Sequence, residues 1–184
     1  SMLVLSPMLV PMLVRADVVT SCGQTVSGKS TLAGDLDCTG VVGNALTIRG
    51  GSLAMNGFTI TGANIGIQCD GACKINGPGR VTGGGFGINA YKNLKLRKVD
   101  VVDNTLLGVQ CWSGCSATGP AEISGNQFGI TAVGTMRLDA MTITDNAGIG
   151  AEAGSYPAPR GKVKATNTTF SGNGIGVFAD KGAK

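Results

Sequence analysis

The chain contains no histidine and few aromatic residues. Histidine is the commonest general base and metal ligand near neutral pH, so its absence excludes the histidine-dependent catalytic and metal sites. One tryptophan, two tyrosines and five phenylalanines in 184 residues require a mainly aliphatic core. The net charge of +4 is mild, and the basic residues are not clustered in sequence. We therefore expect no nucleic-acid partner, no cofactor and no metal.

Glycine, in contrast, is abundant, with 31 residues and no Gly-X-Y period, so a collagen-like chain is excluded. One short pattern that ends in a glycine and an aliphatic residue occurs six times. Its copies are Ile60–Ile67, Val81–Ile88, Val101–Val109, Ile123–Ile130, Ile143–Ala151 and Phe170–Val177. The last glycine of the pattern recurs at a constant interval from Gly66 to Gly150, and then after a longer interval at Gly176. A fixed period of this length indicates a stacked solenoid.

Each period contains alternating apolar and polar residues typical of strands, with three short strands expected per coil. Ile75, Leu96 and Leu138 are expected to point inward from the first strand. The second strand is expected to bury Ile60, Val81, Val102, Ile123, Ile143 and Phe170, and the third Ile67, Ile88, Val109, Ile130, Ala151 and Val177. Asn104, Asn126, Asn146 and Asn173 fall at one corner, where asparagine tolerates a left-handed backbone.

Three segments near the start of the repeats carry a family resemblance: Cys22–Val26, Leu32–Cys38 and Leu53–Gly62. They resemble the opening of secreted right-handed parallel β-helix proteins of the pectate-lyase-like superfamily, and the likeness extends from Cys22 to Ala179. Ala54 and Phe58 depart from it, because many members carry an acidic residue and a histidine there. We predict an all-β fold, a single right-handed parallel β-helix of about seven coils of ~21 residues. The superfamily contains lyases, hydrolases, epimerases, phage spikes and adhesins, so it only loosely constrains function.

The first sixteen residues differ from the rest of the chain. Met2–Ala16 is apolar, but it is too short and too interrupted by Pro7 and Pro11 to form a transmembrane helix. We interpret residues 1–16 as a remnant of a secretory signal or as a cap on the solenoid end, and residues 17–184 as the β-helix domain. This interpretation predicts a secreted or periplasmic protein.

The six cysteines fall into three plausible pairs, Cys22–Cys38, Cys69–Cys73 and Cys111–Cys115. The second and third pairs occupy the same corner two coils apart. A shared zinc site is the alternative, but two coils separate the pairs by about 9.6 Å, too far for thiolates about 2.3 Å from one metal. We therefore expect three disulfides, which agree with an oxidising compartment.

The string Gly23–Ser30 matches the phosphate-binding P-loop pattern. That motif acts only as a loop between a strand and a helix, whereas Thr31–Asp35 is poor in helix-forming pattern and leads into a β-coil. We therefore treat the match as accidental and expect no nucleotide partner.

Two sets of residues are weak candidates for catalysis. Asp103 and Asp145 occupy equivalent turn positions two coils apart, near the upper limit for the carboxyl pair of an inverting glycosidase, although each also suits a simple turn. If the chain were a polysaccharide lyase, Arg97 or Arg137 would serve as base and neutralise a uronate.

Basic and aromatic side chains form the candidate ligand site. Lys74, Lys95 and Arg137 are expected to stack in one outward column, with Ser116 filling the gap, Lys162 continuing it and Arg97 on the same face. Such a stripe suits an extended anionic polymer, or merely keeps the sheet soluble. Tyr91 and Trp112, one period apart and near Lys92, form either a sugar-stacking platform or a covered corner.

These features predict a secreted binding or structural module that contacts an acidic polysaccharide through the stripe and the aromatic corner. One alternative is a small polysaccharide lyase or glycoside hydrolase. Another is a self-assembling structural protein that forms homo-oligomers through its N-terminal segment or its open helix ends.

Overall fold

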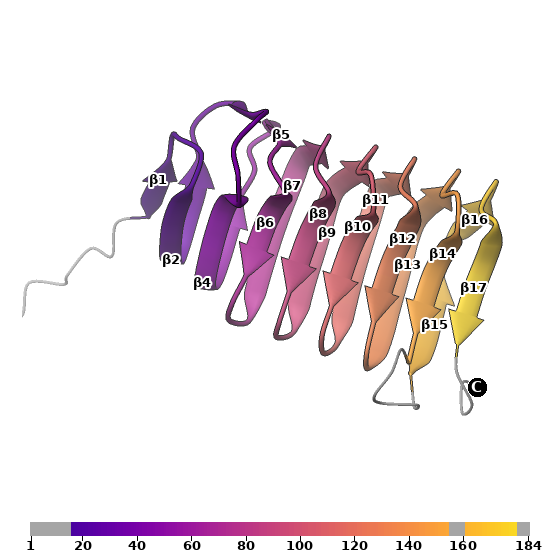
Figure 1. Ribbon diagram of the computed structural model, residues 1–184. Coiled ribbons are helices and arrows are strands. Elements are labelled where there is room, and N and C mark those ends of the chain that lie inside the picture. Colours follow the sequence, from indigo (N-terminus) through magenta and orange to yellow (C-terminus); the bar gives the residue numbers. More distant parts are fainter. Residues whose placement is uncertain (1–15, 155–160, 180–184) are drawn as a thin grey trace, which may run out of the picture.

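The structure is a computed structural model that describes residues 16–154 and 161–179. Within these ranges every regular element is a β-strand, and all seventeen strands belong to one parallel array (Figure 1). The first strands are β1 (Asp17–Val19), β2 (Gln24–Leu32), β3 (Leu36–Cys38), β4 (Asn44–Ala54), β5 (Thr59–Gly62), β6 (Ile65–Cys69) and β7 (Cys73–Thr82). The next are β8 (Phe86–Ala90), β9 (Leu94–Val102), β10 (Leu107–Cys111), β11 (Cys115–Ser124) and β12 (Phe128–Ala132). The last are β13 (Thr135–Thr144), β14 (Ile149–Ala153), β15 (Lys162–Thr166), β16 (Thr169–Ser171) and β17 (Ile175–Ala179).

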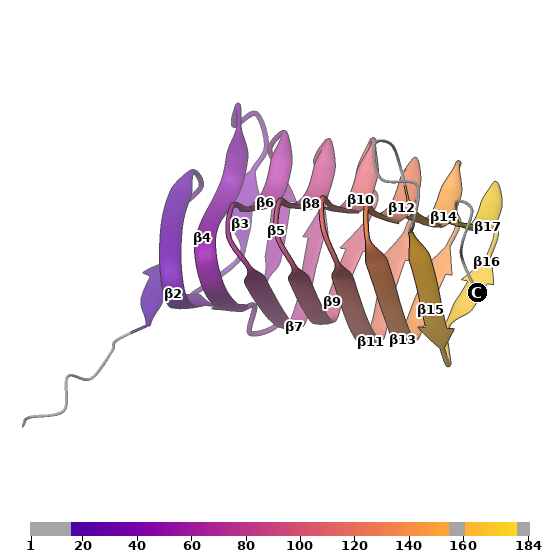
Figure 2. The same ribbon diagram turned by 90° about the horizontal axis from the view of Figure 1, so that it is seen from below.

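The strands stack as a parallel β-solenoid of about six turns (Figures 1 and 2). The fold class is therefore confirmed, although about seven coils were expected. A typical turn contains one long strand, such as β7, and one five-residue strand, such as β8, each paired in parallel with its equivalents in the neighbouring turns. The count is lower because the described residues before β2 contribute only the three-residue strand β1.

The expectation of three short strands per coil needs one correction. In the central turns the first two are a single long strand (β7, β9, β11 or β13), whose register shifts midway, for example between Asn76 and Gly79 where β7 pairs with β9. The chain bends at this point through residues such as Lys98 and Ala140, which have positive φ angles of 54° and 52°. Pairing resumes beyond the bend, so one strand runs along two sides of the solenoid.

The core consists of inward columns that follow the predicted period. Ile67, Ile88, Val109 and Ile130 align in neighbouring short strands and are buried, as are Ile75, Leu96 and Leu138 in the long strands.

One inward residue was wrongly assigned. Val101, not Val102, pairs with Val81 and Ile123. Leu94 lies seven residues before Val101, whereas its partner Cys73 lies eight residues before Val81, because β7 holds one more residue at the bend.

A ladder of buried asparagine side chains joins successive turns at one corner. The side-chain Nδ2 of Asn104 donates to Oδ1 of Asn126 (3.1 Å), Asn126 donates to Asn146 (3.0 Å), and Asn146 donates to Asn173 (2.8 Å). Each of these Oδ1 atoms also accepts the backbone N–H of the preceding asparagine, at 3.0–3.1 Å. The left-handed residue at the corner is the one before the asparagine, such as Asp103 or Gly125. The amides therefore bond the next turn as well as their own.

Glycine is required beside this ladder. A Cβ atom at Gly108 would lie 2.6 Å from the carbonyl oxygen of Gly129 and 2.9 Å from Nδ2 of Asn126. Gly87 faces Gly108 and Asn104 at the same distances. The regular glycine period thus reflects a close backbone approach between turns, since no larger residue fits without displacing the ladder.

The three predicted disulfides are present. Cys22 is bonded to Cys38, Cys69 to Cys73 and Cys111 to Cys115. The two short-range bridges close the same corner two turns apart, because Cys69 and Cys111 both align with Ala90.

The two ends of the described solenoid differ. Val19, Val26 and Leu36 are buried at the first end. At the other end the inward residue Val177 is 44% exposed, whereas its equivalent Val109 is fully buried. Ile175 and Phe178 in the same strand are also exposed. The last turn therefore presents an open, apolar edge.

Apart from Ala16, the segment that we interpret as a signal remnant or cap lies outside the described residues. A search of the described ranges finds no helix of the length and hydrophobicity needed to span a membrane.

We expect Asn126→Ala to destabilise the fold by about 2–3 kcal/mol, because its removal leaves buried backbone and amide groups without partners. Urea denaturation followed by circular dichroism measures this change. Asn64→Ala is the matched control, since Asn64 is exposed. Equal stabilities of the two variants would contradict a structural role for the ladder.

Gly108→Ala should cost at least about 2 kcal/mol, because the added methyl group overlaps the next turn. Gly34→Ala should change the free energy of unfolding by less than about 1 kcal/mol, since a Cβ at Gly34 meets nothing within 4 Å. Thermal melts of both variants test the difference, and similar melting temperatures would refute the close-approach argument.

Candidate functional site

A column of basic side chains runs along the first halves of the long strands. The register aligns Lys74 with Lys95, then Ser116 and Arg137, as the sequence predicted. The column continues with Lys164 rather than Lys162, because the step from Arg137 to its partner in β15 is longer than the regular period. Lys162 pairs instead with Thr135.

The column also extends further toward the N-terminus than the sequence indicated. Lys29 aligns with Ser52, and Ser52 aligns with Lys74. Both of these steps are longer than the regular period, which is why the sequence pattern did not reveal them. With Arg97, which lies one outward position further along β9, these residues form the basic stripe. Its members are Lys29, Ser52, Lys74, Lys95, Arg97, Ser116, Arg137 and Lys164.

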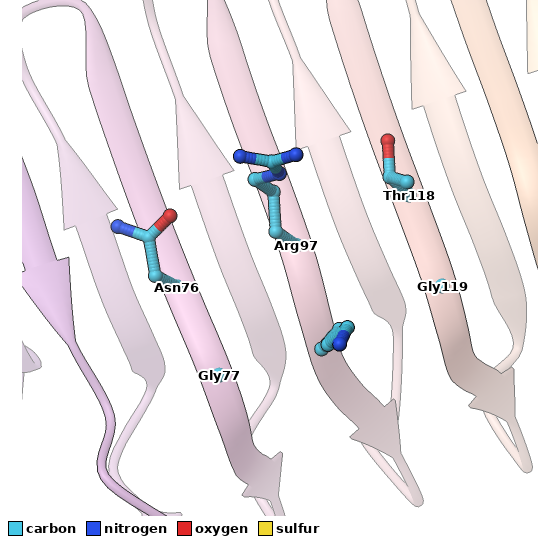
Figure 3. Close-up of a pocket in the computed structure, with 6 residues that line it drawn as sticks. Asn76, Gly77, Arg97, Thr118 and Gly119 are labelled. Carbon is cyan, nitrogen blue, oxygen red and sulfur yellow. The ribbon is translucent and has the colours of Figure 1, made fainter.

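The stripe borders a series of shallow hollows. One of about 370 Å³ is lined by Asn76, Gly77, Arg97, Lys98, Thr118 and Gly119. In Figure 3 the side chains of Asn76, Arg97 and Thr118 project to the same side from adjacent strands. Two neighbouring hollows, of about 280 and 240 Å³, share Lys95 and Ser116, and the second also reaches Arg137. Together the hollows follow the stripe across several turns.

Two glycines line the first hollow at the bend. A Cβ at Gly77 would overlap the carbonyl oxygen of Lys98, and one at Gly119 would overlap that of Ala140. Neither position therefore admits a side chain without displacing the next turn.

Acidic and basic side chains are used differently in this structure. Six aspartates accept hydrogen bonds from the described chain: Asp17, Asp35, Asp37, Asp70, Asp100 and Asp103. Among the described lysines and arginines only Arg80 makes such a bond, in an exposed ion pair with Asp103 (3.4 Å). The stripe cations are thus exposed and without an ionic partner in the described ranges.

One carboxyl group has a shifted pKa. The side chain and the backbone N–H of Thr39 donate to Asp37 and hold the pKa of this exposed carboxyl below its ordinary value. Asp37 lies in β3, away from the basic stripe, so this shift belongs to a local turn.

The aromatic corner consists of Tyr91 and Trp112 in adjacent turns, 51% and 47% exposed. The indole Nε1 of Trp112 donates to Oδ1 of Asn89 (3.1 Å), and Asn89 in turn donates to Gln68 (2.9 Å). Asn89 and Gln68 lie on the outer face of the short-strand sheet, so Trp112 leans toward that sheet and away from the stripe. Tyr91, Trp112 and nearby Lys92 do not line the hollows along the stripe. The structure therefore separates the two parts of the predicted ligand site.

The candidate carboxylates occupy turn positions. Asp103 and Asp145 both have a φ angle of 55°, and glycine takes the same position in the intervening turn, at Gly125. Oδ1 of Asp103 lies against Gly125, and Asp145 packs in the same way on Gly172. No hydrogen bond or ion pair in the described residues connects either aspartate with Arg97 or Arg137, the other catalytic candidates. The turn interpretation accounts for both carboxylates.

The P-loop-like string lies within and just before strand β2, which pairs with β1 and β4. The chain continues from it into β3 rather than into a helix, so the loop and helix N-terminus that hold phosphate are not formed. The described residues also contain no group of three Cys, Asp or Glu side chains placed to hold a metal ion.

Sequence reasoning missed an apolar row on the outer face of the short strands. Phe86, Leu107 and Phe128 align in register and are half-buried. They fall inside the repeated turn pattern, which concealed them. The recurrence of an aliphatic or aromatic residue directly before each period glycine was the signal that could have revealed the row.

Comparison of the chain with known protein families, curated proteins and solved structures finds no match. The functional argument therefore rests on the geometry of the site.

Proposed function

We propose that the protein is a secreted binding module that holds an acidic polysaccharide along the basic stripe, and that it belongs to the pectate-lyase-like β-helix proteins. The observation that supports this proposal most directly is the in-register stacking of basic side chains. Lys74, Lys95, Arg137 and Lys164 align, with Ser116 between Lys95 and Arg137. Successive turns lie about 4.8 Å apart, so the stripe offers positive charges along one line at this spacing or, where Ser52 or Ser116 intervenes, at twice this spacing. A polymer with a carboxylate on each repeating unit matches this arrangement.

The chemistry of the stripe supports such a ligand. Arg97 and Arg137 can each bind a carboxylate through two parallel N–H groups, whereas the lysines act as point charges. Because the stripe cations have no ionic partner among the described residues, binding breaks no existing ion pair there. The hollows are shallow, which suits a chain that runs across the surface. Tyr91, Trp112 and Lys92 contact this polymer only where it turns over the corner.

The three disulfides support secretion, since such bonds persist mainly in oxidising compartments. Lyase activity is the enzymatic alternative and would yield an unsaturated uronate product. Binding is preferred because the candidate carboxylates are accounted for by turns and are not linked to Arg97 or Arg137.

We expect Lys74→Gln/Lys95→Gln to weaken binding of polygalacturonate about tenfold, the change that about 1.4 kcal/mol produces. The affinity of the wild-type protein should also fall as salt is added, because exposed charges are screened. Isothermal titration calorimetry at two salt concentrations measures both effects. Arg49→Gln/Arg80→Gln is the control, since it removes the same charge outside the stripe. Equal loss in both double variants, or no binding by the wild-type protein, would refute the proposal.

Assembly is a second candidate function, favoured by the open edge at β17. This strand is uncharged and exposes Ile175, Val177 and Phe178, whereas the neighbouring edge strand β15 carries Lys162 and Lys164. Lysine protects an edge strand from pairing with another chain, and β17 lacks this protection. We infer that a second copy pairs with β17 across a two-fold axis, in which antiparallel pairing buries the open end.

Val177→Lys should abolish dimerisation by placing a charge on the apolar edge. Leu106→Lys should leave it unchanged, because Leu106 is equally exposed at 44% but lies on a corner away from β17. Sedimentation equilibrium over a range of concentrations distinguishes the two. A wild-type protein that stays monomeric throughout would overturn the assembly hypothesis.

A further inference from the structure

Another hollow lies on the outer face of the short-strand sheet, separate from the three along the basic stripe. It measures about 210 Å³ and is lined by Leu107, Gln110, Phe128, Thr131 and Glu152, from strands β10, β12 and β14. The register aligns Leu107 with Phe128, and Gln110 with Thr131 and then Glu152. One wall is thus apolar, and the other is a row of hydrogen-bonding side chains.

The polar row consists of Gln68, Asn89, Gln110, Thr131 and Glu152, and its hydrogen bonding differs between its two ends. At Gln68 and Asn89 the amides are occupied, since Asn89 donates to Gln68 and accepts from Trp112. No such hydrogen bonds are found within the described ranges for the side chains of the next three members, Gln110, Thr131 and Glu152. The hydrogen-bonded row therefore ends where the hollow begins.

Thr131 lies at the centre of the polar wall. Its residue is only 8% exposed, so its side chain is held firmly by its neighbours. Its hydroxyl makes no hydrogen bond within the described residues and lines the hollow, so it is free to bond a hydroxyl group of a ligand.

We propose that this hollow binds a neutral sugar unit. A sugar ring presents C–H groups on its faces and hydroxyls around its rim, which match a half-buried phenylalanine beside a polar row. Gln110 and Thr131 can both donate and accept hydrogen bonds, and Glu152 accepts them. The Glu152 carboxylate repels anions, so this site selects against the uronates that suit the basic stripe. The inference stands independently of the proposed function, because the site lies on another sheet and favours the opposite charge.

Titration of the ¹⁵N-labelled full chain with cellohexaose, mannohexaose and xylohexaose tests the site by nuclear magnetic resonance. We expect one of these probes to produce saturable shifts in the amide signals of β10, β12 and β14. Phe128→Ala should weaken this binding at least about tenfold through loss of the stacking surface. Thr131→Val should weaken it similarly while leaving the apolar wall in place, since only the hydroxyl is replaced.

Phe86→Ala is the matched control, because Phe86 belongs to the same apolar row one turn before the hollow. It should bind the sugar as the wild-type protein does, and unchanged spectra outside the site show that each variant is folded. The proposal is overturned if no probe shifts these signals at millimolar concentration, or if Phe128→Ala and Thr131→Val bind normally. It is also overturned if the same signals move with protein concentration alone, which would show that a second copy covers the hollow.

Discussion

The asparagine ladder is the interaction on which the stacking of this solenoid depends. At the corner between the long and the short strand, neighbours such as Asp103 and Thr105 still donate to carbonyl oxygens of adjacent turns, but the N–H of the asparagine between them does not. From Asn126 onward, the Oδ1 of each ladder asparagine accepts both this N–H and the side-chain amide of the preceding asparagine, while its Nδ2 donates to carbonyl oxygens, as Asn126 does to Ser124. A side chain with both a donor and an acceptor is needed, because a buried group without a partner would oppose the turn.

The ladder also sets the surface chemistry. Its close packing requires glycine beside it, as at Gly108, and this brings successive turns into a fixed register. A fixed register places equivalent outward residues in straight columns. A residue type that recurs at the repeat period therefore forms a continuous row on the surface. The basic stripe and the apolar row both arise in this way. Their spacing is a property of the core, whereas their chemical character is free to vary.

The sequence predicted the fold class, two of the three disulfides and most inward columns because these follow the regular glycine period, whereas Cys22–Cys38 was the pair that remained. It failed where the chain gains or loses residues within a turn. Val102 was assigned inward in place of Val101, because that change is compensated inside one coil. Lys162 was placed in the stripe in place of Lys164, because the period does not show where the extra residues of the last turn are accommodated. The orientation of the Trp112 side chain could not be predicted either, because it depends on a hydrogen bond to Asn89 in the neighbouring turn. Contacts between turns cannot be deduced from a local sequence pattern.

The uneven use of charge is what connects the fold with the proposed binding. Four described aspartates accept backbone N–H groups: Asp100 accepts that of Glu122, Asp35 that of Thr59, and Asp17 and Asp37 act in the same way. Asp103 occupies a left-handed turn position that costs most residues about 1–2 kcal/mol, which aspartate tolerates better than most. The architecture therefore accounts for these carboxylates, whereas it gives no role to the lysines and arginines of the stripe. Solubility would be served equally by cations scattered over several faces. Their alignment on one sheet, beside a series of shallow hollows, is the observation on which the proposed anionic ligand rests.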